Sequence, residues 1–403
     1  MECYADFGFF PRKDDRYWES PFTSYTYDKY AYEEACRESV LGKRTYTLCD
    51  SLTATDASYL VEPVDGLWLL AIDGGVYLPK EMKDGKWTYQ GSSAGYNLVL
   101  KHKPFLLPWV RKVVEEARKR HKTLVAFSHY PLVDFNDGVS ESVRRMWGDR
   151  RFDLHRVPEA EVSEAFLQAG LRLHFAGHMH VNDTGIWEGK DGKHLYNIQV
   201  PSIATYVPAY KILTIESDEV FRVETVTLDT VLGFDSLFPL YRAEYQSDSL
   251  RGYSPVWNKE ILSARTYGEF CDYQFRDLVR LRFIPRDLPE SWRACLDFTG
   301  ARMLKAVSGE DKANNADWTG WCMKDLVLDV YRLRYAERLA LKDIPETRLA
   351  AYRYLFDRAR ISPLRSAEVE IVNGLGTLFL AFLNGEPCQN FVIDLEKDTI
   401  TGD

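Results

Sequence analysis

The sequence predicts an α/β domain over residues 1–232, followed by a mainly α-helical domain over residues 233–403. In the first part, short apolar runs alternate with segments whose apolar residues recur every three or four positions, which is typical of strands alternating with amphipathic helices. In the second part the helical spacing dominates, as in Met323, Leu326, Val327 and Val330. A chain of 403 residues is long enough for two domains with separate cores.

The first strand signals in the chain form a hairpin. Residues 1–56 contain no clear strand, although residues 27–39 are compatible with a helix. The runs 58–64 and 67–72 are apolar and are separated by Asp65-Gly66, a strong turn signal between two antiparallel strands. We therefore expect a β-hairpin that ends at Asp73-Gly74-Gly75.

Two strand–helix–strand steps follow the hairpin. The helical spacing predicts helices over 106–117 and 162–169, and the apolar runs predict strands at 123–127 and 171–175. The arginine-rich segment 134–157 between them is predicted to be an exposed excursion. Residues 186–230 are predicted to be all-β. The second domain is expected to contain helices near 257–283, 289–307, 323–340, 344–360 and 366–384, and a final hairpin at 391–399.

Composition and charge exclude some classes of partner. The apolar fraction of 45% and the charged fraction of 28% are those of an ordinary globular protein. The net charge of −9 argues against nucleic acid or an anionic membrane as the main partner. The seven cysteines include no Cys-x-x-Cys pair, which indicates free thiols. With no apolar run of membrane-spanning length and no leader pattern, the chain as written is predicted to be cytoplasmic.

Histidines stand at the ends of two predicted strands. His129 follows the strand at 123–127, and His178 and His180 follow the strand at 171–175. In an open α/β sheet such strand ends open onto one edge, where sites form. Neutral imidazole nitrogen is a ligand for Zn, Mn, Fe or Co. The two motifs together predict that His129, His178 and His180 are metal ligands.

Other polar residues have simpler interpretations. Gly148-Asp149 and Asp153-Leu154-His155 carry ligand-type side chains, but they lie among arginines and are interpreted as a solvated charged loop. Asp73 lies either near the site or in a turn. His174 alternates within its strand and is predicted to be packed. The remaining histidines are interpreted as surface residues: His102, His121 and His194.

The motifs Ser128-His129-Tyr130-Pro131 and Gly177-His178-Met179-His180 resemble the second half of the calcineurin-like metallophosphoesterases, over roughly residues 50–230. The resemblance implies a four-layer α/β/β/α sandwich with a two-metal centre of Mn, Fe or Zn between its sheets. By the family pattern His129 and His178 ligate one metal and His180 the other, and a bridging hydroxide attacks phosphorus. Catalytic and substrate-binding residues are not assigned by these motifs.

The sequence departs from this family in its first part. The family's Asp-x-His, Gly-Asp-x-x-Asp/Asn and Gly-Asn-His motifs do not occur before Ser128, and no histidine precedes His102. The expected fold is therefore an incomplete sandwich that lacks its first β-α-β units. We expect either that Met1 is an internal methionine taken as a start or that the gene is a truncated relative. An export signal in a missing upstream segment would change the expected compartment.

Two functions remain open from the sequence. The first is a metal-dependent phosphoester hydrolase acting on a small substrate, with a phosphodiester slightly preferred, whose two-metal centre is incomplete in this chain. The second is a catalytically inactive remnant that acts as a binding or scaffold protein. Homo-oligomer formation also stays open.

Overall fold

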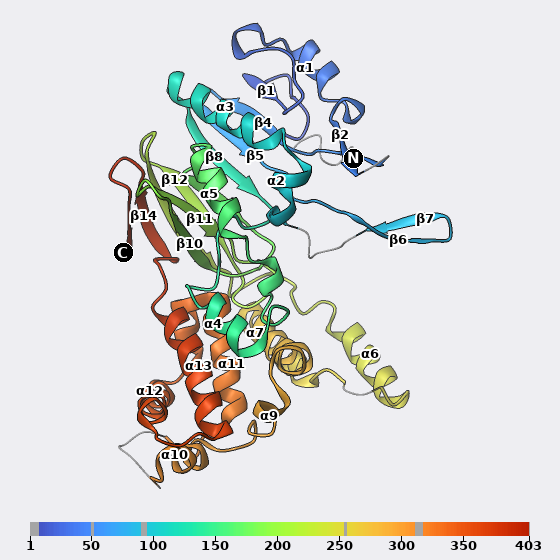
Figure 1. The fold of residues 1–403 in the computed structure, drawn as a ribbon. Coiled ribbons are helices and arrows are strands. Elements are labelled where there is room, and N and C mark those ends of the chain that lie inside the picture. The colour runs from blue at the N-terminus through green and yellow to red at the C-terminus, as the bar shows by residue number, and fades with distance from the viewer. Residues whose placement is uncertain (1–7, 50–51, 90–94, 254–255, 311–316, 403) are drawn as a thin grey trace.

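The centre of the molecule is a seven-stranded mixed sheet, with strand order β1-β4-β5-β8-β9-β11-β10 (Figure 1). The structure is a computed structural model, and it describes the chain except for residues 1–7, 50–51, 90–94, 254–255, 311–316 and 403. Strands β5, β8, β9 and β11 run parallel, and the sheet edges are antiparallel. The strands are β1 (Tyr17–Glu19), β4 (Tyr59–Val64), β5 (Leu67–Ala71), β8 (Thr123–Ser128), β9 (Leu173–Ala176), β10 (Asp183–Glu188) and β11 (His194–Gln199).

Helices cover one face of this sheet. They are α3 (Leu106–Lys119) and α5 (Ala160–Gln168), close to the predicted ranges. The buried side of α3 contains Leu106, Val110 and Val113, as its spacing predicts. These residues share a core with Phe166 of α5 and Leu70 of β5. The mixed α/β class of the first half is therefore confirmed.

A second sheet packs against the opposite face. Val125 and Ile198 of the central sheet share a buried cluster with Phe221, Val223 and Phe391. The second sheet consists of β12 (Ala209–Ile215), β13 (Val220–Thr227), β14 (Asn390–Asp394) and β15 (Thr399–Gly402). The final hairpin, which the sequence grouped with the helical half, thus extends a sheet of the first half through the β13–β14 pairing. The described layers are helix, sheet and sheet.

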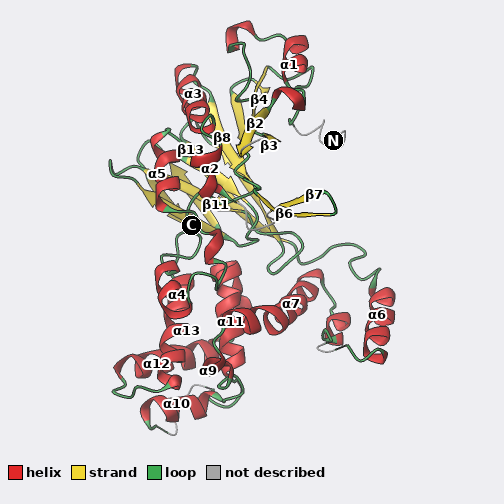
Figure 2. Ribbon diagram, turned by 45° about the vertical axis from the view of Figure 1, so that its right-hand side comes forward, coloured by secondary structure: helices red, strands yellow, loops and turns green. Residues whose placement is uncertain are grey.

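The C-terminal half is mainly helical, and Figure 2 shows its helices grouped together on one side of the strands. Its largest core is formed around α11 and α13, from residues such as Leu326, Val330 and Phe379. The helices are α6 (Phe238–Leu250), α7 (Tyr267–Leu278), α8 (Ile284–Asp287), α9 (Glu290–Arg293), α10 (Gly300–Ser308), α11 (Met323–Ala336), α12 (Glu346–Ile361) and α13 (Ala367–Leu383).

The segment 134–157 is buried much more than the sequence predicted. It contains α4 (Ser140–Trp147), and Phe152 and Leu154 belong to the core of the helical half. Asp153 is 3% exposed and pairs with Arg286 and Arg334. The prediction of a solvated charged loop was wrong for Asp153, because its arginine partners lie more than a hundred positions away in the chain, whereas Asp149 is exposed as predicted.

The N-terminal part contains strands that the sequence did not reveal. Besides β1, residues 1–56 include the hairpin β2 (Thr45–Cys49) and β3 (Leu52–Thr55). A further unpredicted hairpin, β6 (Pro79–Lys83) and β7 (Lys86–Tyr89), projects from the body of the molecule (Figure 1). The predicted helix at 27–39 is a 3-10 turn, Tyr27–Lys29, followed by α1 (Tyr32–Glu38). The remaining short helix of this half is α2 (Val99–His102).

None of the helices formed by the described residues combines the length and the apolar character that a membrane crossing requires.

Candidate metal centre

The structure brings two of the three predicted ligands into direct contact. His129 follows β8, and His178 lies in the loop after β9. Because β8 and β9 are parallel neighbours, their carboxyl ends meet at one edge of the sheet. His129 Nε2 and His178 Nδ1 are 2.9 Å apart. The sequence-based expectation that both loops open at one edge is therefore confirmed.

The backbone of the second loop directs alternate residues to opposite sides. Met179 is 4% exposed and packs into the core shared with the helical half. His178 and His180 have φ values of 63° and 58°, in the left-handed region. Such a conformation costs a non-glycine residue on the order of 1–3 kcal/mol. The packing of Met179 provides stabilisation that can offset this cost. The side chains of His178 and His180 are directed away from the core, toward the surface.

The electrostatic surroundings favour neutral imidazoles. Burial lowers the pKa of His129, and the nearby His180 lowers it further. Burial likewise lowers the pKa of His180, with a smaller contribution from the charge of Arg156. Metal binding requires unprotonated imidazole nitrogen. His129 and His180 are therefore in the form that a metal ion needs at neutral pH.

The distance between the two nitrogens suits one shared ion. Zinc–nitrogen bonds are about 2.0–2.1 Å long, so two nitrogens on one ion lie about 3.0–3.5 Å apart. The observed separation of 2.9 Å is close to the short end of that range. In the described structure one nitrogen donates a hydrogen bond to the other. A metal ion would replace that shared proton with only a small movement of the rings.

Tyrosines form the wall beside the histidines. The ring of Tyr130 lies 4.7 Å from the ring of His178 and 5.0 Å from that of His129, between centroids. Its hydroxyl group is 2.9 Å from the hydroxyl of Tyr77. The sequence reasoning assigned no role to Tyr77 or Arg156, because neither belongs to the two histidine motifs. Tyr130, by contrast, was part of the Ser-His-Tyr-Pro motif.

The carboxylates considered from sequence do not join the histidines. Asp73 Oδ2 is 2.8 Å from the buried Lys103 ammonium, and its Oδ1 accepts a hydrogen bond from Gly75 N, so it acts as a turn residue. Asp149 pairs with Arg144 at the surface. In the part of the chain that the structure describes, a single group of three close ligand-type side chains occurs, and it lies elsewhere: Asp137, Asp183 and Glu337.

The other histidines have structural environments. His174 is 0% exposed and is hydrogen-bonded to Ser128 and Asn197, as expected of a packed residue. Of the remaining four, His155 belongs to the segment 134–157 described above, and the other three lie away from the predicted ligands. His102 contacts the carbonyl of Leu48, His121 is exposed after α3, and His194 lies beside Asp398.

Comparisons with known proteins add no family assignment. A scan against family models finds none that matches the chain, and a search of curated proteins finds no match. The resemblance to metallophosphoesterases thus rests on the two motifs.

Proposed function

We propose that this chain forms part of a metal-dependent phosphoester hydrolase, in which His129, His178 and His180 contribute metal ligands. The observation that carries the proposal is the 2.9 Å contact between His129 Nε2 and His178 Nδ1 at the ends of adjacent parallel strands. The bound metals, Mn, Fe or Zn, would supply Lewis-acid activation of a small phosphoester and a hydroxide nucleophile. A phosphodiester substrate is slightly preferred.

The layers of the fold are compatible with an incomplete four-layer sandwich. The described chain shows helices, the central sheet and the four-stranded sheet. Tyr210 and Ile212 of β12 lie on the outer side of the second sheet and are 40% and 42% exposed. A fourth, helical layer would cover side chains in this position. This exposed face supports the sandwich that the resemblance implies.

A cationic side chain is also placed near the histidines. Arg156 is close enough to affect the pKa values of His180 and Tyr130 through its charge. Guanidinium groups recognise phosphoryl oxygens through paired N–H donors. We infer that Arg156 binds the anionic part of the substrate and that His129 and His178 hold the metal ion beside it.

An alternative function is a catalytically inactive remnant that acts as a binding or scaffold protein. One observation favours it: among the described residues, no carboxylate joins the histidines in a group of three ligands. A two-metal centre with histidine ligands alone leaves the positive charge of the metals uncompensated. This alternative predicts at most one bound metal and no turnover.

Hydrolysis of a chromogenic phosphodiester separates the two functions. The 403-residue chain would be assayed with Mn²⁺ against bis-p-nitrophenyl phosphate, and with p-nitrophenyl phosphate as the monoester. We expect metal-dependent turnover that is lost in His178→Asn, because asparagine tolerates the left-handed backbone but removes the imidazole. His121→Asn is the matched control, since His121 also has a positive φ but lies away from the site.

The outcomes decide between the functions. Turnover in the wild type and in His121→Asn, but not in His178→Asn, supports the hydrolase. Metal binding by the histidines without turnover on either ester supports the inactive remnant. Turnover that survives in His178→Asn contradicts the proposed role of this residue as a ligand.

A further inference from the structure

A second cluster of ligand-type side chains lies where the two halves of the molecule meet. Asp137 follows β8, Asp183 begins β10, and Glu337 follows α11. One carboxylate oxygen from each of the three residues lies within 4.8 Å of the corresponding oxygens of the other two. Asp183 and Glu337 are only 3% exposed, and Asp137 is partly buried. The backbone N–H of Asn182 donates to the carbonyl of Tyr335, so the two halves are also joined directly beside the cluster.

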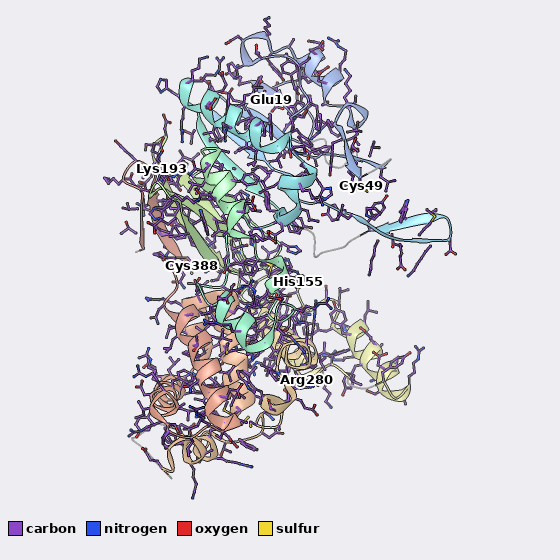
Figure 3. The ribbon with its side chains drawn as sticks, in the orientation of Figure 1. Glu19, Cys49, His155, Lys193, Arg280 and Cys388 are labelled. Carbon is purple, nitrogen blue, oxygen red and sulfur yellow. The ribbon has the colours of Figure 1, made fainter. Side chains whose placement is uncertain are left out.

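Most oxygens of Asp183 and Glu337 are buried and poorly satisfied. Both carboxylate oxygens of Asp183 and Oε1 of Glu337 have no hydrogen bond of good geometry among the described residues, although the Thr184 N–H and the Glu337 carboxyl lie close to Asp183. Only Oε2 of Glu337 has one, the thiol of Cys388 at 2.9 Å. In Figure 3, Cys388 lies at the junction between the strands and the helices. Buried carboxylates without donors or cations are costly, so this arrangement calls for a bound positive group.

A neighbouring amide provides an independent indication of a ligand. Gln199 lies directly opposite Asp183 in the β10–β11 pair, so both side chains project from the same face of the sheet. Gln199 is 0% exposed, yet neither Oε1 nor Nε2 has a hydrogen-bond partner in the described structure. Its amide is thus a buried, unpartnered polar group beside the carboxylates. Through Oε1 it offers a fourth, neutral oxygen ligand.

The charges around the cluster are not balanced without a bound cation. Lys211 is the nearby cation, and its ammonium donates to three neutral oxygens: Asn182 Oδ1 at 2.7 Å, Thr225 Oγ1 at 2.9 Å and the carbonyl of Cys388 at 2.7 Å. It therefore adds positive potential without binding a carboxylate. The three carboxylates and Lys211 together carry two negative charges, and Asp134 and Glu386 add negative potential at Asp137, so a divalent cation is favoured there.

We propose that Asp137, Asp183 and Glu337, with Gln199 Oε1, bind a hard divalent cation, for which Ca²⁺ is the best fit, and that this ion ties the β-sheets to the helical half. All four ligands are oxygens, which Ca²⁺ and Mg²⁺ prefer over nitrogen or sulfur ligands. Two oxygens at the Ca²⁺ distance of about 2.3–2.6 Å lie at most about 5 Å apart, whereas the limit for Mg²⁺ is about 4.2 Å. The ligand oxygens lie within 4.8 Å of one another, which is inside the Ca²⁺ limit, and Ca²⁺ also tolerates irregular coordination better than Mg²⁺.

The test is calorimetric titration of the full chain, after treatment with EDTA, with CaCl₂ and separately with MgCl₂. We expect one Ca²⁺ per chain, weaker Mg²⁺ binding and a Ca²⁺-dependent rise in the melting temperature. Asp183→Asn and Glu337→Gln should each weaken Ca²⁺ binding by tenfold or more. Asp191→Asn is the matched control, because it removes an exposed carboxylate from the turn that follows β10 and should leave Ca²⁺ binding unchanged.

A neutral variant keeps the proposal testable if a carboxylate variant does not fold. Gln199→Met has a similar volume and no oxygen ligand, and it should also weaken Ca²⁺ binding. His178→Asn should retain the full Ca²⁺ response, which separates this site from the proposed phosphoesterase centre. Absence of Ca²⁺ binding by the wild type would overturn the proposal. Equal Ca²⁺ affinity in the wild type and in the folded variants of Asp183, Glu337 or Gln199 would overturn it as well.

Discussion

The histidine centre and the acidic cluster share two segments of the chain. His129 and Asp137 both follow β8, and His178 and Asp183 both follow β9. The first pair lies at the solvent-facing edge of the sheet, whereas the second lies at the junction with the helical half. A few residues of chain therefore separate two environments with different ligand chemistry.

The difference between the two clusters follows from what covers them. Met179 and Val181 pack into the core of the helical half, and this turns Asp183 inward beside Glu337. The histidines remain on the opposite side of the same loop. Imidazole nitrogen near solvent suits exchangeable Zn, Mn or Fe, while buried carboxylates suit a structural hard cation. One loop thus contributes to both proposed cation sites.

The largest predicted effect concerns the buried ion pair between Asp153 and Arg334, which lies behind the loops of both clusters. Arg334 is 2% exposed and contacts Asp153, the carbonyl of Phe152 and Asn136, which lies directly before Asp137. Asp153→Asn leaves the buried charge of Arg334 without its carboxylate, whereas Arg286 keeps its pair with Asp287. Removing one partner of a buried ion pair costs about 3–5 kcal/mol. Urea unfolding would measure this loss, and both Zn²⁺ and Ca²⁺ binding should weaken with it.

Asp149→Asn is the control for this prediction. It removes a carboxylate from the same segment, but its pair with Arg144 is exposed. We expect a change within about 0.5 kcal/mol. Similar losses in the two variants would mean that the Asp153–Arg334 contact does not support the junction.

A second prediction uses a substitution at Gly185 that should disturb the acidic cluster but not the histidine centre. A Cβ at Gly185 would lie 2.6 Å from the carbonyl oxygen of Asp134, in the loop that carries Asp137. Gly185→Ala should therefore displace this loop and cost about 1–3 kcal/mol. We expect Ca²⁺ binding to fall in calorimetry while Zn²⁺ binding by the histidines persists. Parallel loss of both metals would contradict their separation.

A third prediction concerns the pH dependence of stability that arises from the buried His174. Burial lowers the pKa of His174 to about 4, whereas the unfolded chain titrates near 6.5. Between these values the unfolded state binds more protons, so stability falls as the pH falls from about 6.5 to 4. Between pH 7 and pH 5 the loss from this group is about 2 kcal/mol.

The pH dependence of His174→Gln tests this assignment. Urea unfolding at pH 7 and pH 5 should show a smaller loss for the variant than for the wild type. His121→Asn should retain the wild-type loss, since His121 is exposed. An unchanged pH dependence in His174→Gln would show that other groups cause it.

The smallest predicted effect concerns metal binding at acidic pH. Because the pKa values of His129 and His180 are lowered by burial, these imidazoles stay neutral below the pH at which ordinary histidines gain a proton. A zinc ion held by two ordinary histidines would lose about 15-fold in affinity between pH 7.5 and 6.0, and in the proposed site of His129 and His178 the lowered pKa of His129 reduces this loss. We expect a smaller loss of Zn²⁺ affinity between pH 7.5 and 6.0, measured by calorimetry. A loss of 15-fold or more would contradict the buried environment.

Local patterns predicted much of the fold. Asp65-Gly66 and its flanking apolar runs correctly gave the β4–β5 hairpin, and the spacing of Leu106, Val110 and Val113 gave α3. The meeting of His129 and His178 also followed from sequence, because parallel neighbouring strands end at one edge. These features depend on residues that are close in the chain or on a general rule of sheet topology.

Long-range partners were not predictable from the same patterns. Nothing near Asp153 indicated that Arg334 would bury it, and nothing near Asp183 pointed to Glu337 on the helical half. The pairing of β13 with β14 likewise joins residues from opposite ends of the helical segment. Such contacts are determined by the packing of the two halves. A periodic sequence pattern reports which face is apolar but not what will cover it.

The most direct test of two chemically distinct cation sites is anomalous X-ray scattering from crystals of the 403-residue chain grown with Zn²⁺ and Ca²⁺. Data collected on both sides of the zinc absorption edge would locate zinc. The account predicts a zinc peak between His129 and His178, and a separate calcium peak among Asp137, Asp183 and Glu337. Zinc bound at the carboxylates, or no ion at either cluster, would contradict it.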